Sequence, residues 1–316
     1  MTIGIVAFGP HAGLAVFKAL QAVERVARGS IGGYASFVAV TADAVLRHET
    51  QRGGTGTLFT AGESTGLDPD PATAAARLAG VMSSGPDRPE PLAQFTPAAA
   101  GVGLVTGHRL PNMPGADGMP LNSAALDLMR GGTDAPEAVD RVLDGNPGAD
   151  AGLIAGSLVG AVYARNSDRV MQRPDLGQAR RVAGGSVVAI LHNAIRPVAP
   201  LADLAAEVAL DVMLRRGESD GEIEVRAGTP VVAGSENRVL VGPELVATEI
   251  QTSDGRLVTG RWNCAAIYLG ARVVQDGTDL GATMTEPNMI VENGRVVSMS
   301  GQEVLRVGFR KRDEAD

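Results

Sequence analysis

The stretch GVGLVTGHRLPNMPGADGMPLNSAALDLMRGGTDAPEAVDRVLDGNPGADAGLIAGSLVGAVY, residues 101–163, decides the architecture that we predict for this chain. It begins with a short apolar strand at residues 102–105, which leads into polar residues and a Gly/Pro-rich loop. A helix follows at residues 122–130, and Asn122 or Ser123 can cap its N-terminus.

The Gly-Gly pair at 131–132 ends this helix, because glycine enters the left-handed region without steric cost. Thr133 or Asp134 starts a second short helix, and residues 153–163 are predicted to form a return strand. A strand, a polar loop, two helices and a strand make a layered unit that presents side chains at a strand end.

Four polar residues follow the first strand of this unit, and they are the main candidates for a site. Thr106 offers a hydroxyl donor, His108 a titrating group, Arg109 a fork for a carboxylate, and Asn112 an amide. Their clustering within seven residues favours a binding or catalytic role. An ordinary surface role for the cluster stays open.

Composition limits the classes of function. The chain has 316 residues, a net charge of −8 and a pI near 5.1, which argues against nucleic acid or an anionic membrane as a partner. The single cysteine, Cys264, excludes an intramolecular disulfide and a multi-thiolate metal site. We see no signal peptide and no apolar run of 18 residues, so we expect a cytoplasmic protein.

The N-terminal segment suggests a nucleophile. Residues 2–8 (TIGIVAF) read as a buried strand, and residues 12–28 have a helical pattern. If Met1 is removed, the amino group of Thr2 can act as the base for its own hydroxyl. The alternative is that any chain can begin with Met-Thr.

The rest of the chain divides into two parts. We predict a helix at residues 72–83, a Pro-rich connector at 84–101, a buried strand at 186–191 and a helix at 201–215. From residue 222 to 310, strands recur every 8–12 residues, which is typical of a β-rich module. The predicted domains are therefore a layered α/β domain at 1–221 and a β-rich module at 222–316, either separate or integrated with the first.

Three of the four histidines follow strands, namely His11, His108 and His192. One interpretation is a common mouth lined by three strand ends, and a metal ion bound there would be a third functional hypothesis. The other interpretation is that these histidines satisfy backbone groups at helix ends. We predict no cofactor and no metal ligand from the sequence.

Further polar residues are candidates for binding substrate. Arg52, Gly53 and Gly54 could present backbone N–H groups to an oxyanion or a carboxylate, although an ordinary turn has the same pattern. The remaining candidates follow strands, and they are Arg165, Asn166, His192 and Asn193. The motifs GxxxxGK[ST], GxSxG and HExxH are absent, and GVGLVTG matches GxGxxG only loosely.

The runs VGLVTGHRLPN and SAALDLMRGGTDAPEAVDRVL resemble the early segment of gamma-glutamyltranspeptidase-type N-terminal-nucleophile (Ntn) hydrolases. They also resemble a bacterial family of Ntn-hydrolase-like proteins of unknown function. The resemblance covers residues 101–163 and, more weakly, 2–18, and it implies an α-β-β-α sandwich. The transpeptidases carry a catalytic threonine at the start of the next strand, but this chain has Asp150, Ala151 and Gly152 there. Either the nucleophile is Thr2, or the fold is kept without this chemistry.

The functional prediction is a hydrolase that acts on amide bonds of a small polar metabolite. Thr2 would attack, His108 and Asn112 would position the substrate or stabilise the oxyanion, and Arg52 and Arg109 would hold a carboxylate. The alternatives are a non-enzymatic ligand-binding or assembly protein of the same fold, and the metal-assisted hydrolase. Homo-oligomer formation is left open.

Overall fold

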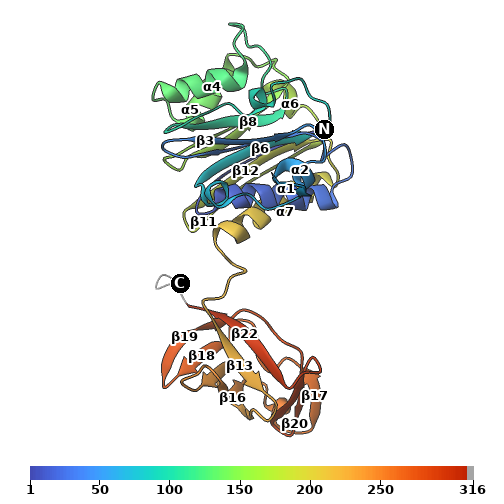
Figure 1. Cartoon of the computed structure of the whole chain (residues 1–316), viewed down its shortest axis with the longest axis vertical. Coiled ribbons are helices and arrows are strands. Elements are labelled where there is room, and N and C mark those ends of the chain that lie inside the picture. The colour runs from blue at the N-terminus through green and yellow to red at the C-terminus, as the bar shows by residue number, and fades with distance from the viewer. Residues whose placement is uncertain (312–316) are drawn as a thin grey trace. The chain divides into compact units, whose positions relative to one another are not determined.

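The computed structural model describes residues 1–311, and the chain divides into two units. The first unit is Met1–Arg216, and the second begins at Gly217. The first unit combines helices and strands, whereas the second consists almost entirely of strands (Figure 1). The chain is a mixed α/β protein with a β-rich C-terminal part, which confirms this much of the predicted fold class.

The first unit is built on an antiparallel sheet of six strands. In spatial order the strands are β11 (Leu176–Ala183), β12 (Ser186–Asn193), β1 (Thr2–Phe8), β6 (Leu78–Ser84), β2 (Ala35–Val40) and β3 (Val45–Thr50). Every residue of β1 is buried, as the apolar run 2–8 predicts. Side chains alternate between the faces of a strand, so Ile3 and Ile5 pack toward helices while Val6 packs toward a second sheet.

The second sheet of this unit has four strands. They are β10 (Val162–Asn166), β9 (Ala151–Ser157), β8 (Gly103–Arg109) and β7 (Ala98–Ala99). Val6, Leu104 and Ile154 share one apolar core, which joins the two sheets face to face. Where β1 crosses β8, a Cβ atom added to Gly4 would lie 2.3 Å from the carbonyl oxygen of Gly107. Glycine at position 4 therefore sets how closely the two backbones approach.

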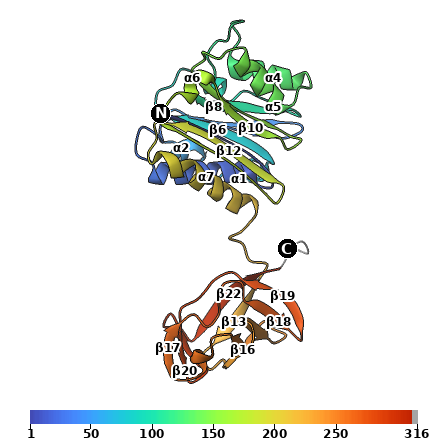
Figure 2. The same ribbon diagram turned by 180° about the vertical axis from the view of Figure 1, so that it is seen from behind.

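Helices cover the outer faces of both sheets. Helices α1 (Ala12–Val26) and α7 (Val198–Met213) pack on the six-stranded sheet, because each has an apolar stripe that joins the core of Ile3 and Ile5. Helices α4 (Leu121–Arg130) and α5 (Ala135–Asp144) pack on the four-stranded sheet. Figures 1 and 2 show the two helix pairs on opposite sides of the paired sheets.

Short elements complete the first unit. They are α2 (Thr55–Leu58), the strand pair β4 (Thr60–Ala61) and β5 (Ser64–Thr65), α3 (Pro71–Ala75), the 3-10 helix η1 (Leu92–Phe95) and α6 (Asp168–Met171). Within residues 1–311, no helix is long and apolar enough to cross a membrane.

The second unit contains two sheets around its own apolar core, which includes Ile223, Val239 and Met289. The larger sheet has the order β13 (Gly221–Arg226), β22 (Val304–Arg310), β19 (Thr278–Thr283), β18 (Arg272–Gln275), β15 (Arg238–Val241), β16 (Ala247–Thr252) and β14 (Val231–Ala233). The smaller sheet has the order β17 (Arg261–Cys264), β20 (Met289–Glu292) and β21 (Arg295–Met299). Within the stretch where we predicted recurring strands, residues 255–258 instead form the 3-10 helix η2 (Gly255–Val258).

The predicted helix at residues 72–83 is wrong. Only α3 is helical, and the chain then enters β6, an interior strand between β1 and β2. All seven residues of β6 are buried, since helices cover one face and the second sheet covers the other. A strand buried on both faces loses the apolar–polar alternation, so the Ala-rich run at 72–76 together with the apolar start of β6 matched a helical pattern.

The stretch 101–163 forms the predicted order of elements with two corrections. Pro120, and not Asn122 or Ser123, precedes the first residue of α4, and the Asn122 amide donates to the carbonyl of Gln94. The return strand is a hairpin of β9 and β10. The predicted cap of the second helix is confirmed, because the Asp134 carboxylate accepts the N–H of Glu137 at 2.8 Å.

Candidate functional site

Thr2 lies at the end of the six-stranded sheet where several strands place polar residues together. Because β1 is antiparallel to both neighbours, its first residue pairs with the last residues of β12 and β6, Asn193 and Ser84. The last residues of β8, His108 and Arg109, approach the same point from the second sheet. One strand start and three strand ends therefore meet around Thr2.

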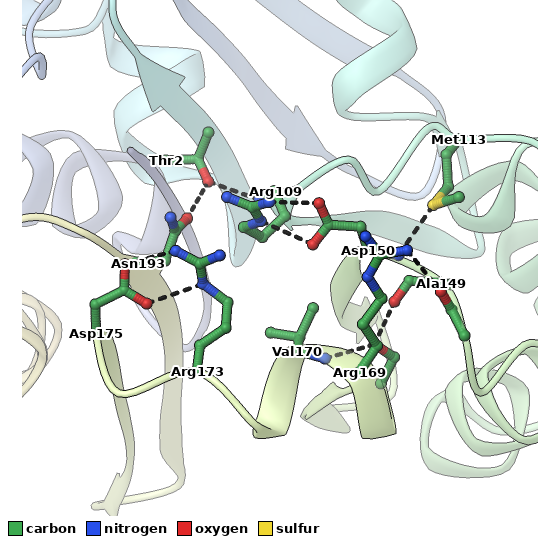
Figure 3. Close-up of polar contacts among 12 residues, drawn as sticks. Thr2, Arg109, Met113, Ala149, Asp150, Arg169, Val170, Arg173, Asp175 and Asn193 are labelled. Atoms are coloured by element: carbon green, nitrogen blue, oxygen red, sulfur yellow. Dashed lines mark hydrogen bonds and ion pairs between the residues drawn. The ribbon is translucent and has the colours of Figure 1, made fainter.

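The Thr2 hydroxyl is held by two hydrogen bonds. Oγ1 donates to Oδ1 of Asn193 at 2.8 Å and accepts the backbone N–H of Arg109 at 2.6 Å. Figure 3 shows both partners reaching the hydroxyl. Thr2 is 8% exposed, so these contacts are mostly shielded from water. A nearly buried hydroxyl with one donor and one acceptor has a fixed orientation.

Arg109 is itself fixed by an ion pair. Its Nε lies 2.9 Å from Oδ1 of Asp150, and its Nη2 contacts Oδ2 of the same carboxylate. The hydrogen bonds from Arg109 hold the pKa of the Asp150 carboxyl below its usual range. The backbone of Arg109 has φ of 65°, in the left-handed region that arginine seldom occupies.

Two further arginines add positive charge around Thr2. Arg173 makes a bidentate pair with Asp175, at 2.9 and 2.6 Å, and lowers the pKa of that carboxyl. Arg88 donates from Nη2 to the Ser84 hydroxyl at 2.7 Å, and its Nε is buried with no hydrogen-bond partner among the described residues. No carboxylate in the described part of the chain pairs with Arg88, so it carries charge that a ligand could neutralise.

The Met1 amino group lies in the same environment. Burial lowers its pKa below the usual 8.0, and the charges of Arg109, Arg88 and Arg173 lower it further. The Ser84 hydroxyl donates to the Met1 carbonyl oxygen. The peptide bond between Met1 and Thr2 therefore has Ser84 on its carbonyl and the arginines around it.

His108 belongs to the site but is enclosed behind it. Its Nε2 lies 2.6 Å from Oδ1 of Asn166, and burial lowers the pKa of His108 to about 4. Asn193 lies close enough to favour the protonated ring, yet no hydrogen bond of normal geometry joins Asn193 Nδ2 to it. A neutral, buried His108 is held by Asn166 and does not act as a proton carrier near pH 7.

His192 is next to Asn193 in sequence but faces away from Thr2. It pairs with Ile3 in the sheet, and its neighbours Val188 and Ile190 belong to the helix-facing core. Its side chain is fully buried, and burial lowers its pKa to about 4. The prediction that His192 lines the same site as Asn193 is wrong, because successive residues of a strand point to opposite faces.

His11 lies at the far end of the sheet. It follows Phe8, which pairs with Val187, whereas Thr2 pairs with Asn193. The length of β1 puts about 20 Å between the two ends, at ~3.3 Å per residue. The proposed common mouth of three histidines does not form, and the described residues contain no group of three or more His, Cys, Asp or Glu side chains that could hold a metal.

Several predicted binding residues have other partners within the chain. Asn112 donates to Oε1 of Gln94 at 2.8 Å, and Thr106 donates to the carbonyl of Phe95 at 3.1 Å. Arg165 faces α5 and pairs with Asp140 and Asp144 at 2.9 and 2.7 Å. None of these contacts includes Thr2. Asn112, Thr106 and Arg165 therefore have structural partners, while Asn166, from the same strand as Arg165, faces His108.

The turn at the glycine pair does present an N–H donor to a carboxylate, but that carboxylate belongs to the chain itself. Gly53 and Gly54 have φ of 90° and 52°, and the next N–H, that of Thr55, donates to the carboxylate of Glu24 at 3.0 Å. Arg52 points to the surface, where it pairs with Asp87. The expected carboxylate-binding turn therefore binds a carboxylate of the protein itself.

The sequence analysis missed five residues of the site: Ser84, Arg88, Asp150, Arg173 and Asp175. Ser84 and Arg88 both lie in the segment 84–101, which we predicted to be a Pro-rich connector. Arg173 and Asp175 lie in a polar segment before β11, a strand that we did not predict. Arginines and aspartates next to strand ends were the available signal for these residues. The sequence did not show which of them pair, since Arg109 and Asp150 are 41 residues apart.

Residues 2–222 match a family described as Domain of unknown function (DUF6963), and residues 228–304 match Domain of unknown function (DUF7259). No curated protein matches the chain. One solved structure is similar, a glutamine phosphoribosylpyrophosphate (PRPP) amidotransferase from B. subtilis complexed with ADP and GMP. It is 10% identical, with a TM-score of 0.37 over 60% of this chain, and the match spans 41% of the amidotransferase chain.

Proposed function

The chain belongs to the DUF6963 family, and we propose that it is an amide-bond hydrolase whose nucleophile is Thr2, exposed by cleavage of the Met1–Thr2 bond. One observation carries the proposal. The Thr2 hydroxyl is oriented by Asn193 and by the Arg109 N–H at the first position of a buried interior strand. Such fixed geometry is what a nucleophile needs.

The packing of the first unit supports the finer fold assignment that we propose, a layered α-β-β-α sandwich of the Ntn-hydrolase kind. Two sheets share a core that includes Val6 and Leu104, and a helix pair covers each outer face. In this arrangement β1 lies within one of the inner layers. Its first residue is then at the edge of the layers, where a substrate can approach.

The proposed reaction uses the free amino group of Thr2 as the base. The amine accepts the proton of Oγ1 while Oγ1 attacks the substrate carbonyl carbon, and the same proton then passes to the leaving amine. Water hydrolyses the resulting ester and restores Thr2. Asn193 Nδ2 is a buried donor without a partner among the described residues, and we assign it to the oxyanion. Asn112, for which we predicted this role, is replaced by Asn193 because it binds Gln94.

The charges around Thr2 favour a substrate that carries a carboxylate. Arg109 and Arg173 are each paired with an aspartate, which leaves Arg88 as the guanidinium with an unused buried N–H. Charge-assisted hydrogen bonds from arginine to a carboxylate are among the stronger ones in proteins. We therefore assign Arg88 to the substrate carboxylate, in place of Arg52, which is exposed and paired with Asp87.

Arg88→Gln is expected to raise KM for amides that carry a carboxylate by about 10- to 100-fold, because a hydrogen bond to a charged group contributes ~1.5–3 kcal/mol. The KM of neutral amides should change little. Steady-state kinetics on matched acidic and neutral amides measure the difference. Arg52→Gln is the matched control, and an equal loss on both substrates in Arg88→Gln would remove Arg88 from this role.

Activity is expected to rise with pH through an apparent pKa below 8.0. The base is the neutral form of the α-amino group, which is present above its pKa. The Met1 amino group shows that burial and the three arginines lower the pKa of an amine here. The pH dependence of kcat/KM tests this expectation, and a midpoint above 8.0 would contradict it. His108 has a pKa of about 4, so its titration should not change kcat/KM near neutral pH.

Intact mass and N-terminal sequencing test the proposal directly. A chain that begins at Thr2 and hydrolyses members of an amide panel supports it. A chain that retains residue 1 on every molecule and shows no hydrolysis refutes it. The unpartnered Nε of Arg88 would then favour the alternative, a non-enzymatic protein that binds a small acidic ligand.

A further inference from the structure

Arg109 makes two kinds of contact, one through its backbone and one through its side chain. Its N–H donates to Thr2 Oγ1 at 2.6 Å, and its side chain makes two contacts with the Asp150 carboxylate. Figure 3 shows Arg109 between Thr2 and Asp150. The orientation of the N–H on the proposed nucleophile therefore depends on how Arg109 is held.

The backbone of Arg109 does not adopt this orientation by preference. A φ of 65° is unfavourable for a side chain with a Cβ atom, and it persists only where the surroundings impose it. Arg109 is the last residue of β8, so the regular ladder ends with its partner Ala151. Beyond that point, the backbone and side chain of Asp150 both contact the turn.

Asp150 holds this turn at two points. Its carboxylate binds the Arg109 guanidinium, and its carbonyl accepts the N–H of Leu110 at 3.1 Å. The side chains of Arg109 and Asp150 are 25% and 16% exposed, so the pair is only partly screened by water. The backbone contact does not depend on the side chain at position 150, which means that the ion pair can be tested separately.

We propose that Asp150 is a positioning residue, which holds the Arg109 N–H on the Thr2 hydroxyl through its ion pair with the Arg109 side chain. The importance of this positioning for catalysis rests on the proposed function of Thr2. The geometry itself can be measured whether or not the protein is an enzyme.

The charged groups around the pair identify a matched control. Arg169 and Arg173 also face Asp150, and the amino terminus faces Arg88, Arg109, Arg173 and Asp175, while His108 is neutral behind them. Asp175 makes a similar bidentate pair with Arg173, but it does not contact Arg109. Asp175→Asn removes the same charge from the same neighbourhood and leaves the Arg109 turn untouched.

Amide hydrogen exchange of the full chain, read residue by residue by NMR, tests the positioning role. In Asp150→Asn we expect the Arg109 amide to exchange at least tenfold faster, while interior β8 amides such as Val105 keep their rate. Asp175→Asn should leave the Arg109 rate within twofold, and Asp150→Glu should restore part of the protection. An unchanged Arg109 rate in Asp150→Asn overturns the proposal, and so does an equal acceleration throughout β8, because that is loss of the sheet.

A second measurement connects the positioning to reactivity. On chains that begin at Thr2, a β-lactone electrophile should label the hydroxyl at least tenfold more slowly in Asp150→Asn. The midpoint of its pH profile should also move to lower pH, since Arg109 is no longer neutralised. Asp175→Asn should shift the midpoint in the same direction with a smaller loss of rate. An equal loss in both variants would contradict a special role for Asp150. If the unchanged chain is not labelled, the proposed function fails, and amide exchange alone decides the role of Asp150.

Discussion

Thr2→Ala is expected to abolish amide hydrolysis, with a loss on the order of 10³-fold or more, because removal of a nucleophile leaves only binding and oxyanion stabilisation. Thr2→Ser keeps a hydroxyl next to the same amino group. It should therefore retain at least tenfold more activity than Thr2→Ala. Rates on the best substrate of the amide panel measure both effects.

This experiment needs a check that each variant is still folded. Thr2→Ala leaves Asn193 and the Arg109 N–H without their partner, which can cost about 1–3 kcal/mol of stability. Thermal denaturation followed by circular dichroism shows whether each variant is folded at the assay temperature. Full activity in a folded Thr2→Ala chain that begins at residue 2 would exclude Thr2 as the nucleophile.

Gly4→Ala is expected to produce the largest loss of stability among conservative substitutions in β1. Its Cβ would lie 2.3 Å from the Gly107 carbonyl oxygen, which is backbone and cannot rotate away. The two sheets would have to separate, and overpacking of this kind costs about 3 kcal/mol. For a unit of this size, we expect Tm to fall by roughly 6–12 °C.

Gly148→Ala is the matched control for Gly4→Ala, since a Cβ at position 148 meets nothing within 4 Å. Its stability should stay within about 0.5 kcal/mol of the unchanged chain. Thermal and urea denaturation compare the two variants. A Tm for Gly4→Ala within about 1 °C of the control would show that the sheets can adjust without cost.

Local patterns were sufficient to predict many of the elements around the site. The apolar run from Thr2 to Phe8 predicted β1, and the stretch from Gly101 predicted β8, two helices and a returning chain. The N-terminal position pointed to Thr2, and strand ends pointed to His108, Arg109, Asn166 and Asn193; the structure brings these five residues together. These predictions depend on residues close in sequence, where period and capping are informative.

Strand direction and side-chain parity could not be predicted. The antiparallel pairing of β1 with β12 sends His11 to the opposite end of the sheet from His192, and the alternation along β12 turns His192 away from Asn193. The sequence also could not predict which polar side chains pair with one another. Arg165, Arg52 and Asn112 look available in the sequence, but each has a partner inside the chain.

The distance in sequence between Thr2 and Asn193 has a consequence for biosynthesis. The two residues are 191 positions apart, and β1 needs β12 on one side and β6 on the other. At ~5–20 residues per second, the ribosome adds the intervening chain in roughly 10–40 s. Throughout that interval β1 lacks one of its two neighbours, so the proposed cleavage of the Met1–Thr2 bond could take place before the strand is fully paired. After β12 has paired, Thr2 is only 8% exposed, so cleavage during translation and cleavage after folding would act on different structures.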